Sequence, residues 1–168
     1  MKHTFIFFIL AISIIIGCNN QQELSIGKMQ GMYSLDKFER LDTETGIWSA
    51  EPGRIGWSGY ILYDGQGHMG VHLMPGGYQD FVDNKSLDSL STEELKTVAK
   101  TYQSNFVYFA DYSIKDSMIM HKRLSTTNPK DRGTTLTRHV EFRGDTLILT
   151  PVEKINGLQL RLRWIKLK

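Results

Sequence analysis

The sequence predicts an all-β protein, folded as an antiparallel up-and-down β-barrel of about eight strands with one short α-helix. The segments after Lys28 are short, alternate polar with apolar residues and end at Gly or Asp turns, which is the pattern of antiparallel sheet. Consecutive hairpins also leave no room for the crossovers that a parallel sheet needs. A sheet of this size usually closes, because closure removes exposed edges, and eight strands enclose an interior that can hold one small ligand.

Each strand is expected where apolar residues alternate between two turns. The clearest hairpin joins residues 57–63 to 68–74 through Asp64-Gly65-Gln66-Gly67, whose turn chemistry supplies positive φ. Residues 44–56 and 126–132 are predicted as loops, the first with room for a short strand. The strands are expected at 32–41, 57–63, 68–74, 105–114, 117–125, 133–142, 146–152 and 158–167.

One helix is predicted, over residues 92–104. Ser91 can cap its first turn and Glu94, three residues on, can reach back to complete a capping box. Apolar residues then recur at the helical spacing of Leu95, Val98 and Tyr102.

Composition bounds the class of protein. The chain has 168 residues with 20 Lys and Arg against 18 Asp and Glu, a net charge of +2, which argues against a nucleic-acid binder. Its single cysteine excludes an intramolecular disulfide and a cysteine-rich zinc site. The length fits one domain with a core of its own.

The first 17 residues are predicted to be a signal peptide. Phe5 to Ile16 run apolar except for Ser13, and such a run is too short for a spanning helix, which needs about 20 residues. The junction Ile15-Ile16-Gly17-Cys18 resembles the bacterial lipobox, in which a small residue precedes the cysteine that receives a diacylglyceryl group. The alternative is a signal peptide that happens to end beside a cysteine.

The lipobox resemblance implies a lipid-anchored protein of the bacterial cell envelope. Residues 1–17 would be removed, Cys18 would carry the lipid, and 18–28 would tether the domain at 29–168 to the membrane. Asn19 follows the cysteine in place of the aspartate associated with inner-membrane retention, which favours the outer membrane or a periplasm-facing location.

From about Gly31 to Lys168 the chain resembles the bacterial lipocalin-like domain family. Two positions depart from the pattern, since Tyr33 replaces a usual Trp and Asp111 a usual Gly. The resemblance implies a lipocalin-type barrel with an internal cavity and no particular catalytic mechanism. It is carried, in order, by residues 31–33, 59–65, 67–69, 108–112, 121, 138–142, 144–149 and 162–164.

Arg138 is the most informative candidate for a ligand contact. It shares a strand face with Leu136, Val140 and Phe142, and an arginine among apolar neighbours is costly unless it is paired or faces water or a ligand. Three interpretations stay open: an internal ion pair with Asp111 or Glu141, an anchor for a carboxylate or phosphate head group, or surface exposure. The full set of predicted ligand-binding residues is Tyr60, His72, Tyr108, Tyr112, His121, Arg138 and Trp164.

The histidines and tyrosines of this set have ordinary structural interpretations as well, as satisfied or core residues. His68 and His72 share a strand face about 13 Å apart, which is too far for one metal ion. We therefore expect neither a metal nor a cofactor, and no nucleophile motif predicts a catalytic residue.

The sequence favours a lipid-anchored protein that binds a small hydrophobic or amphipathic ligand in the barrel. One alternative is a hydratase-, isomerase- or cyclase-like enzyme in the cavity, with His121 or Asp111 as acid–base groups and Arg138 stabilising negative charge. Another is a non-catalytic envelope interaction module, whose basic face would be Arg161, Arg163, Lys166 and Lys168.

Overall fold

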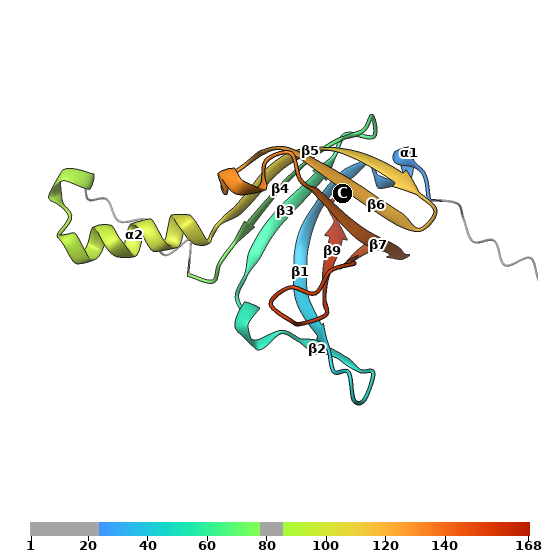
Figure 1. Cartoon of the computed structure of the whole chain (residues 1–168), viewed down its shortest axis with the longest axis horizontal. Helices are drawn as coiled ribbons and strands as arrows, with labels where there is room; N and C mark the ends of the chain where they lie inside the picture. The colour runs from blue at the N-terminus through green and yellow to red at the C-terminus, as the bar shows by residue number, and fades with distance from the viewer. Residues whose placement is uncertain (1–23, 78–85) are drawn as a thin grey trace, which may run out of the picture.

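A computed structural model describes residues 24–77 and 86–168, which form a closed antiparallel barrel (Figure 1). The helices are α1 (Ile26–Met29) and α2 (Thr92–Ser104), with short 3-10 turns η1 (Pro52–Arg54), η3 (Leu87–Ser89) and η4 (Pro129–Asp131). The strands are β1 (Gly31–Leu41), β2 (Trp48–Ala50), β3 (Ser58–Tyr63), β4 (His68–Met74), β5 (Phe106–Lys115), β6 (Met118–Thr126), β7 (Thr135–Arg143), β8 (Thr146–Pro151) and β9 (Leu160–Lys166).

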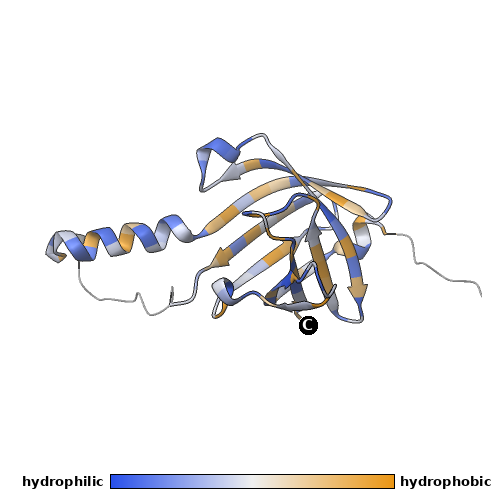
Figure 2. Cartoon of the chain, turned by 60° about the horizontal axis from the view of Figure 1, so that its bottom comes forward, coloured by the Kyte–Doolittle hydropathy of each residue, from blue (hydrophilic) through white to orange (hydrophobic). Residues whose placement is uncertain are grey.

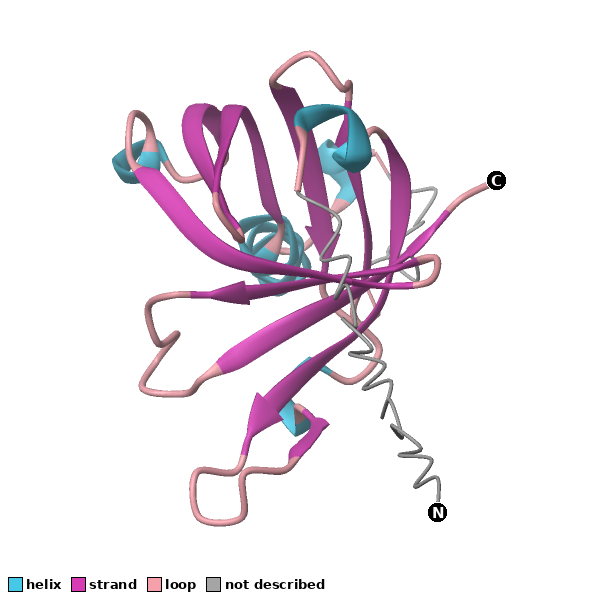
Figure 3. Cartoon of the chain, turned by 90° about the vertical axis from the view of Figure 1, so that its right-hand side faces the viewer, coloured by secondary structure: helices cyan, strands magenta, loops and turns pink. Residues whose placement is uncertain are grey.

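The strands follow one another around the barrel in chain order, from β1 through β3 to β9. The pairing of β1 with β9 closes the ring of eight, and β2 adds a short ninth strand beside the far end of β1 (Figure 3). The predicted fold is therefore confirmed, and the short strand for which residues 44–56 left room is β2.

The first strand pairs with three partners, two in succession along one edge and one along the other. Its start pairs with β3, its end with β2, and most of its length with β9. The register against β9 shifts between Leu35 and Lys37, so that Asp36 is an extra residue in a β-bulge. A bulge increases local twist, which lets one strand serve both the barrel and the extension beyond it.

Alternation along the strands separates the core from the surface (Figure 2). On β5, Tyr108, Ala110 and Tyr112 are buried while the residues between them are exposed. The same period-2 pattern on β3, β6 and β9 sends every second side chain inward, as expected for a sheet with one solvated face. The core is therefore the interior of the barrel.

The helix α1 packs across one end of the barrel. Met29 is fully buried, and the hydroxyl groups of Tyr33 and Tyr112 donate to the carbonyl oxygens of Met29 and Ile26 over 3.0 and 3.2 Å. Part of the segment that the sequence predicted as tether, residues 26–28, thus belongs to the packed structure.

The helix α2 extends away from the barrel (Figures 1 and 2). Its predicted bounds and capping box are confirmed, since the Ser91 hydroxyl accepts from the Glu94 N–H and the Glu94 carboxylate accepts from the Ser91 N–H. No residue of α2 is buried. Across residues 24–77 and 86–168, helices of the length and apolar character needed to traverse a bilayer do not occur.

Candidate functional site

A polar cluster lies inside the barrel, centred on His121. This histidine is on β6, where its inward-facing neighbours along the strand are Ile119 and Arg123, and it is fully buried. Tyr63 from β3 and Tyr108 from β5 reach it from two sides, and both are buried as well. We call Tyr63, Tyr108, His121 and Arg138 of β7 the interior polar cluster.

Both ring nitrogens of His121 are occupied by protein groups. The Nε2 atom lies 3.1 Å from the Tyr63 hydroxyl, while Nδ1 lies 2.9 Å from the Tyr108 hydroxyl and 3.1 Å from Nη1 of Arg138. A guanidinium group can only donate, so Nδ1 must be the unprotonated nitrogen. The proton is therefore on Nε2, which donates to the oxygen of Tyr63.

Burial keeps the histidine and the tyrosines of the cluster neutral. Desolvation, followed by the charge of Arg138, lowers the pKa of His121 well below its usual 6.5. Desolvation raises the pKa of Tyr63 well above 10.0, and it raises the pKa of Tyr108 against the opposing charge of Arg138. The guanidinium of Arg138 is thus the one formal charge of the cluster.

No carboxylate of the described residues neutralises Arg138. The ion pair with Asp111 or Glu141, one of the three interpretations that the sequence left open, does not form: Asp111 is exposed on the outer face of β5, and the Glu141 carboxylate accepts from Arg143. In the described ranges, the side-chain partners of Arg138 are uncharged groups of the interior polar cluster. A partly buried guanidinium group without a carboxylate partner attracts an anion strongly.

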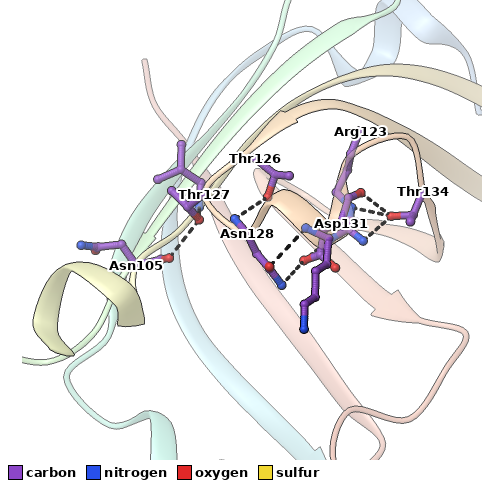
Figure 4. Close-up of polar contacts among 9 residues, drawn as sticks. Asn105, Arg123, Thr126, Thr127, Asn128, Asp131 and Thr134 are labelled. Carbon is purple, nitrogen blue, oxygen red and sulfur yellow. Dashed lines mark hydrogen bonds and ion pairs between the residues drawn. The ribbon is translucent and has the colours of Figure 1, made fainter. Parts of the chain in front are cut away.

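A second interior arginine provides the contrast. Arg123 is also buried on β6, but its guanidinium lies 3.1 Å from the Asp131 carboxylate and donates to the Thr134 hydroxyl (Figure 4). Asn128 donates in turn to Asp131, so the whole η4 region is built around this pair. The fold therefore neutralises Arg123 internally and leaves Arg138 without a described counter-ion.

The wall that carries Arg138 is the more open one. The inward side chains of β7 are all only partly buried, whereas those of β3 and most of β5 are buried. The inner face is therefore most accessible along β7, next to the guanidinium. Apolar side chains packed against the core flank Arg138 on the same strand face, namely Leu136, Val140 and Phe142.

The structure brings together three of the seven predicted site residues, Tyr108, His121 and Arg138. Tyr112 lies beside them, with its ring centroid 5.0 Å from that of Tyr63 in an edge-on contact. Trp164 is in the core at 1% exposure, and its buried indole N–H has no acceptor in the part of the chain that the structure describes.

The other two predicted residues do not line the interior, contrary to the prediction. Tyr60 is 45% exposed on the outer face of β3, because the inward positions of that strand are Gly59, Ile61 and Tyr63. His72 is on the outer side of β4, where its Nε2 lies 3.4 Å from the side-chain oxygen of Asn105.

Sequence reasoning missed Tyr63, which holds the Nε2 side of His121. The segment Tyr60-Ile61-Leu62-Tyr63 is apolar or aromatic at every position, so alternation alone does not assign its inner face. The register with β4 supplies the signal: Tyr63 pairs with Met69 and Ile61 with Val71, both buried.

Within the described ranges, His, Cys, Asp and Glu side chains nowhere gather in threes to hold a metal ion. His68 is bonded instead to Asp64, with 2.6 Å between Nδ1 and Oδ2.

Comparison with known proteins agrees with this architecture. The model of a family described as lipocalin-like domain matches residues 30–164, and the chain belongs to this family. Neither the curated proteins nor the solved structures gave a match. A lipocalin-like barrel is a fold for binding small ligands in general.

Proposed function

We propose that this protein binds a small amphipathic molecule with an anionic head group inside its barrel, and that it does so from a lipid anchor in the bacterial cell envelope. The observation that carries the binding proposal is Arg138, an inward-facing cation whose described partners are all neutral. The lipobox-like junction at Cys18 supports the anchor.

The chemistry of the interior polar cluster selects the head group. A guanidinium presents five N–H donors in a plane, and one of them is directed at His121. Those that remain match the two oxygens of a carboxylate or two oxygens of a phosphate. The apolar side chains of β7 that flank Arg138 would cover the rest of the molecule.

Binding is better supported than catalysis. An acid–base role for His121 needs a nitrogen free for substrate, but both are engaged by the protein. Asp111, the other candidate, is on the opposite face of its strand from the cluster. For the interaction module, the predicted basic face is partly neutralised, because Arg161 pairs with Glu39 and Arg163 with Asp36.

The binding proposal is tested with two fluorescent probes of nearly the same shape. Anilinonaphthalene sulfonate is anionic, and N-phenylnaphthylamine lacks the sulfonate. We expect Arg138→Met to weaken binding of the anionic probe about tenfold or more, as expected for a lost charged hydrogen bond, and to change binding of the neutral probe little. Arg138→Lys keeps the positive charge, so it should retain part of the preference for the anionic probe over the neutral probe.

The matched control is Arg143→Met. Arg143 is exposed at the β7–β8 turn and pairs with Glu141, so its loss removes one positive charge without touching the interior. Equal weakening of both probes by Arg138→Met, or equal weakening of the anionic probe by the two variants, would refute the anionic head-group site.

The anchor is tested by the mass of the N-terminal peptide of protein purified from membranes. We expect the mature chain to begin at Cys18 and to carry a diacylglyceryl thioether, and Cys18→Ser to release the protein from the membrane fraction. Recovery of an unmodified Cys18 peptide from the membrane would contradict the proposal.

A further inference from the structure

An apolar strip covers one outer side of the barrel. Met32 of β1, Leu62 of β3 and Phe109 of β5 all point outward and are 43%, 50% and 60% exposed. Tyr60, Ile165 and Leu167 are exposed next to them. We call the six residues Met32, Tyr60, Leu62, Phe109, Ile165 and Leu167 the apolar wall.

The apolar wall is continuous across neighbouring strands. Met32 pairs with Leu62, Leu62 with Gly70, and Gly70 with Phe109. The ring of Phe109 lies over Gly70, where an added Cβ would stand only 2.9 Å from its Cε1 atom. On the other side, the Leu167 N–H donates to the Met32 carbonyl. Such a contiguous apolar surface marks an interaction site more often than scattered exposed residues do.

No acidic side chain of the described residues lies between the members of the apolar wall, and the nearest carboxylates lie at its borders. The outward positions between its members are Ser34, Gly70 and His72, none of which is acidic. The nearest outward carboxylates along β1 and β5 are Asp36, which pairs with Arg163, and Asp111.

Two lysines alternate with wall residues at the end of the chain, in Ile165-Lys166-Leu167-Lys168. The ammonium of Lys166 lies 5.7 Å from the centroid of the Tyr33 ring, close to the end of the barrel that α1 covers. Lys166 pairs with the buried Tyr33, so its side chain lies on the face of β9 opposite to Ile165 and Leu167, and the outer face carries the apolar wall. Exposed apolar and aromatic side chains of this kind suit the interface of a lipid bilayer.

The N-terminal segment meets the barrel at the end where this wall begins. Met32 lies three residues after Met29, the last residue of α1, and six residue steps separate Cys18 from Leu24, the first described residue. Six steps of extended chain span at most about 20 Å. A lipid on Cys18 would therefore hold the bilayer surface within that distance of the α1 end, where the wall begins.

We propose that the apolar wall rests on the lipid bilayer that carries the anchor, so that the barrel lies on its side. The proposal rests on the acylation of Cys18 proposed above. In the ring of eight strands, β7 is four places from β3, so the partly open wall with Arg138 faces away from the bilayer.

The test uses the full mature lipoprotein in vesicles of phosphatidylethanolamine and phosphatidylglycerol. Because the native cysteine is acylated, a single introduced cysteine can be labelled with a polarity-sensitive fluorophore. We compare Leu62→Cys on the wall with His139→Cys, an exposed outward residue of β7, which is four places from β3 in the ring. We expect quenching by doxyl-labelled lipid to be about threefold stronger or more at position 62 than at position 139.

The outcomes separate the two proposals. Mass spectrometry of the same sample reports acylation: an unacylated Cys18 overturns both the anchor and the side-on orientation. With Cys18 acylated, equal and weak quenching at the two positions overturns the orientation alone. The label at position 62 could instead be shielded in detergent solution while sedimentation shows self-association. That result overturns the orientation as well, because a second copy of the chain then covers the apolar wall.

Discussion

His121 connects three strands through one imidazole, since its partners come from β3, β5 and β7. A neutral ring suits this position because it can accept from a guanidinium at one nitrogen and donate to a phenol oxygen at the other. Protonation would place a second cation beside Arg138 and remove the acceptor. The residue is therefore structural as well as part of the candidate site.

The stability of the protein should fall as the pH is lowered through the region below 6.5. The folded-state pKa of His121 lies well below that value, so the unfolded chain binds a proton that the folded chain does not. The free energy of unfolding should lose up to about 1.4 kcal/mol per pH unit from this group, measured by urea unfolding between pH 7.5 and 5.0.

Two variants isolate the contribution of His121. His121→Gln should have a shallower pH dependence than the wild type over this range, whereas His139→Gln, at an exposed position of β7, should keep the wild-type dependence. Equal slopes for the wild type and His121→Gln would show that another group controls the acid sensitivity.

At the scale of elements, the sequence predicts the strands well and their inner faces unevenly. On β9, Arg161 and Arg163 alternate with buried apolar residues, so the polar–apolar contrast identifies the inner face, where the predicted Trp164 lies. The predicted Tyr108, Tyr112 and His121 of β5 and β6 also lie inside the barrel. On β3 the apolar wall supplies outward hydrophobic residues, so the polar–apolar contrast that would distinguish Tyr60 from Tyr63 is missing. The interior polar cluster also depends on β7 lying next to β6, which is a property of the barrel rather than of any one segment.

The helix α1 had no clear signal in the sequence, because four residues are too few for periodicity. Its stability comes from tertiary contacts, chiefly the burial of Met29. Met29→Ala should therefore lower the free energy of unfolding by about 2–5 kcal/mol, measured by chemical denaturation. Ile26→Ala, which shortens an exposed side chain of the same helix, should change it by less than about 1 kcal/mol. Similar effects of the two substitutions would contradict a specific role for Met29 in closing this end.

At the scale of the whole molecule, β9 completes both the sheet and the core. It pairs with β8 on one side and with β1 on the other, and Leu160, Leu162 and Trp164 are buried. Deleting residues 160–168 should leave two unpaired edges and abolish cooperative unfolding, measured by near-UV circular dichroism during thermal denaturation. Deleting only residues 167–168 should preserve the cooperative transition. A cooperative transition in the longer deletion would show that the barrel does not depend on its last strand.

The seam between β1 and β9 also sets the order of events during biosynthesis. The second edge of β1 finds its partner only when β9 has left the ribosome, so closure of the barrel must follow synthesis of residues 160–166. A sheet that stays open until β9 is made is compatible with the export that the proposed lipid anchor requires, because such a chain crosses a membrane unfolded before the barrel closes.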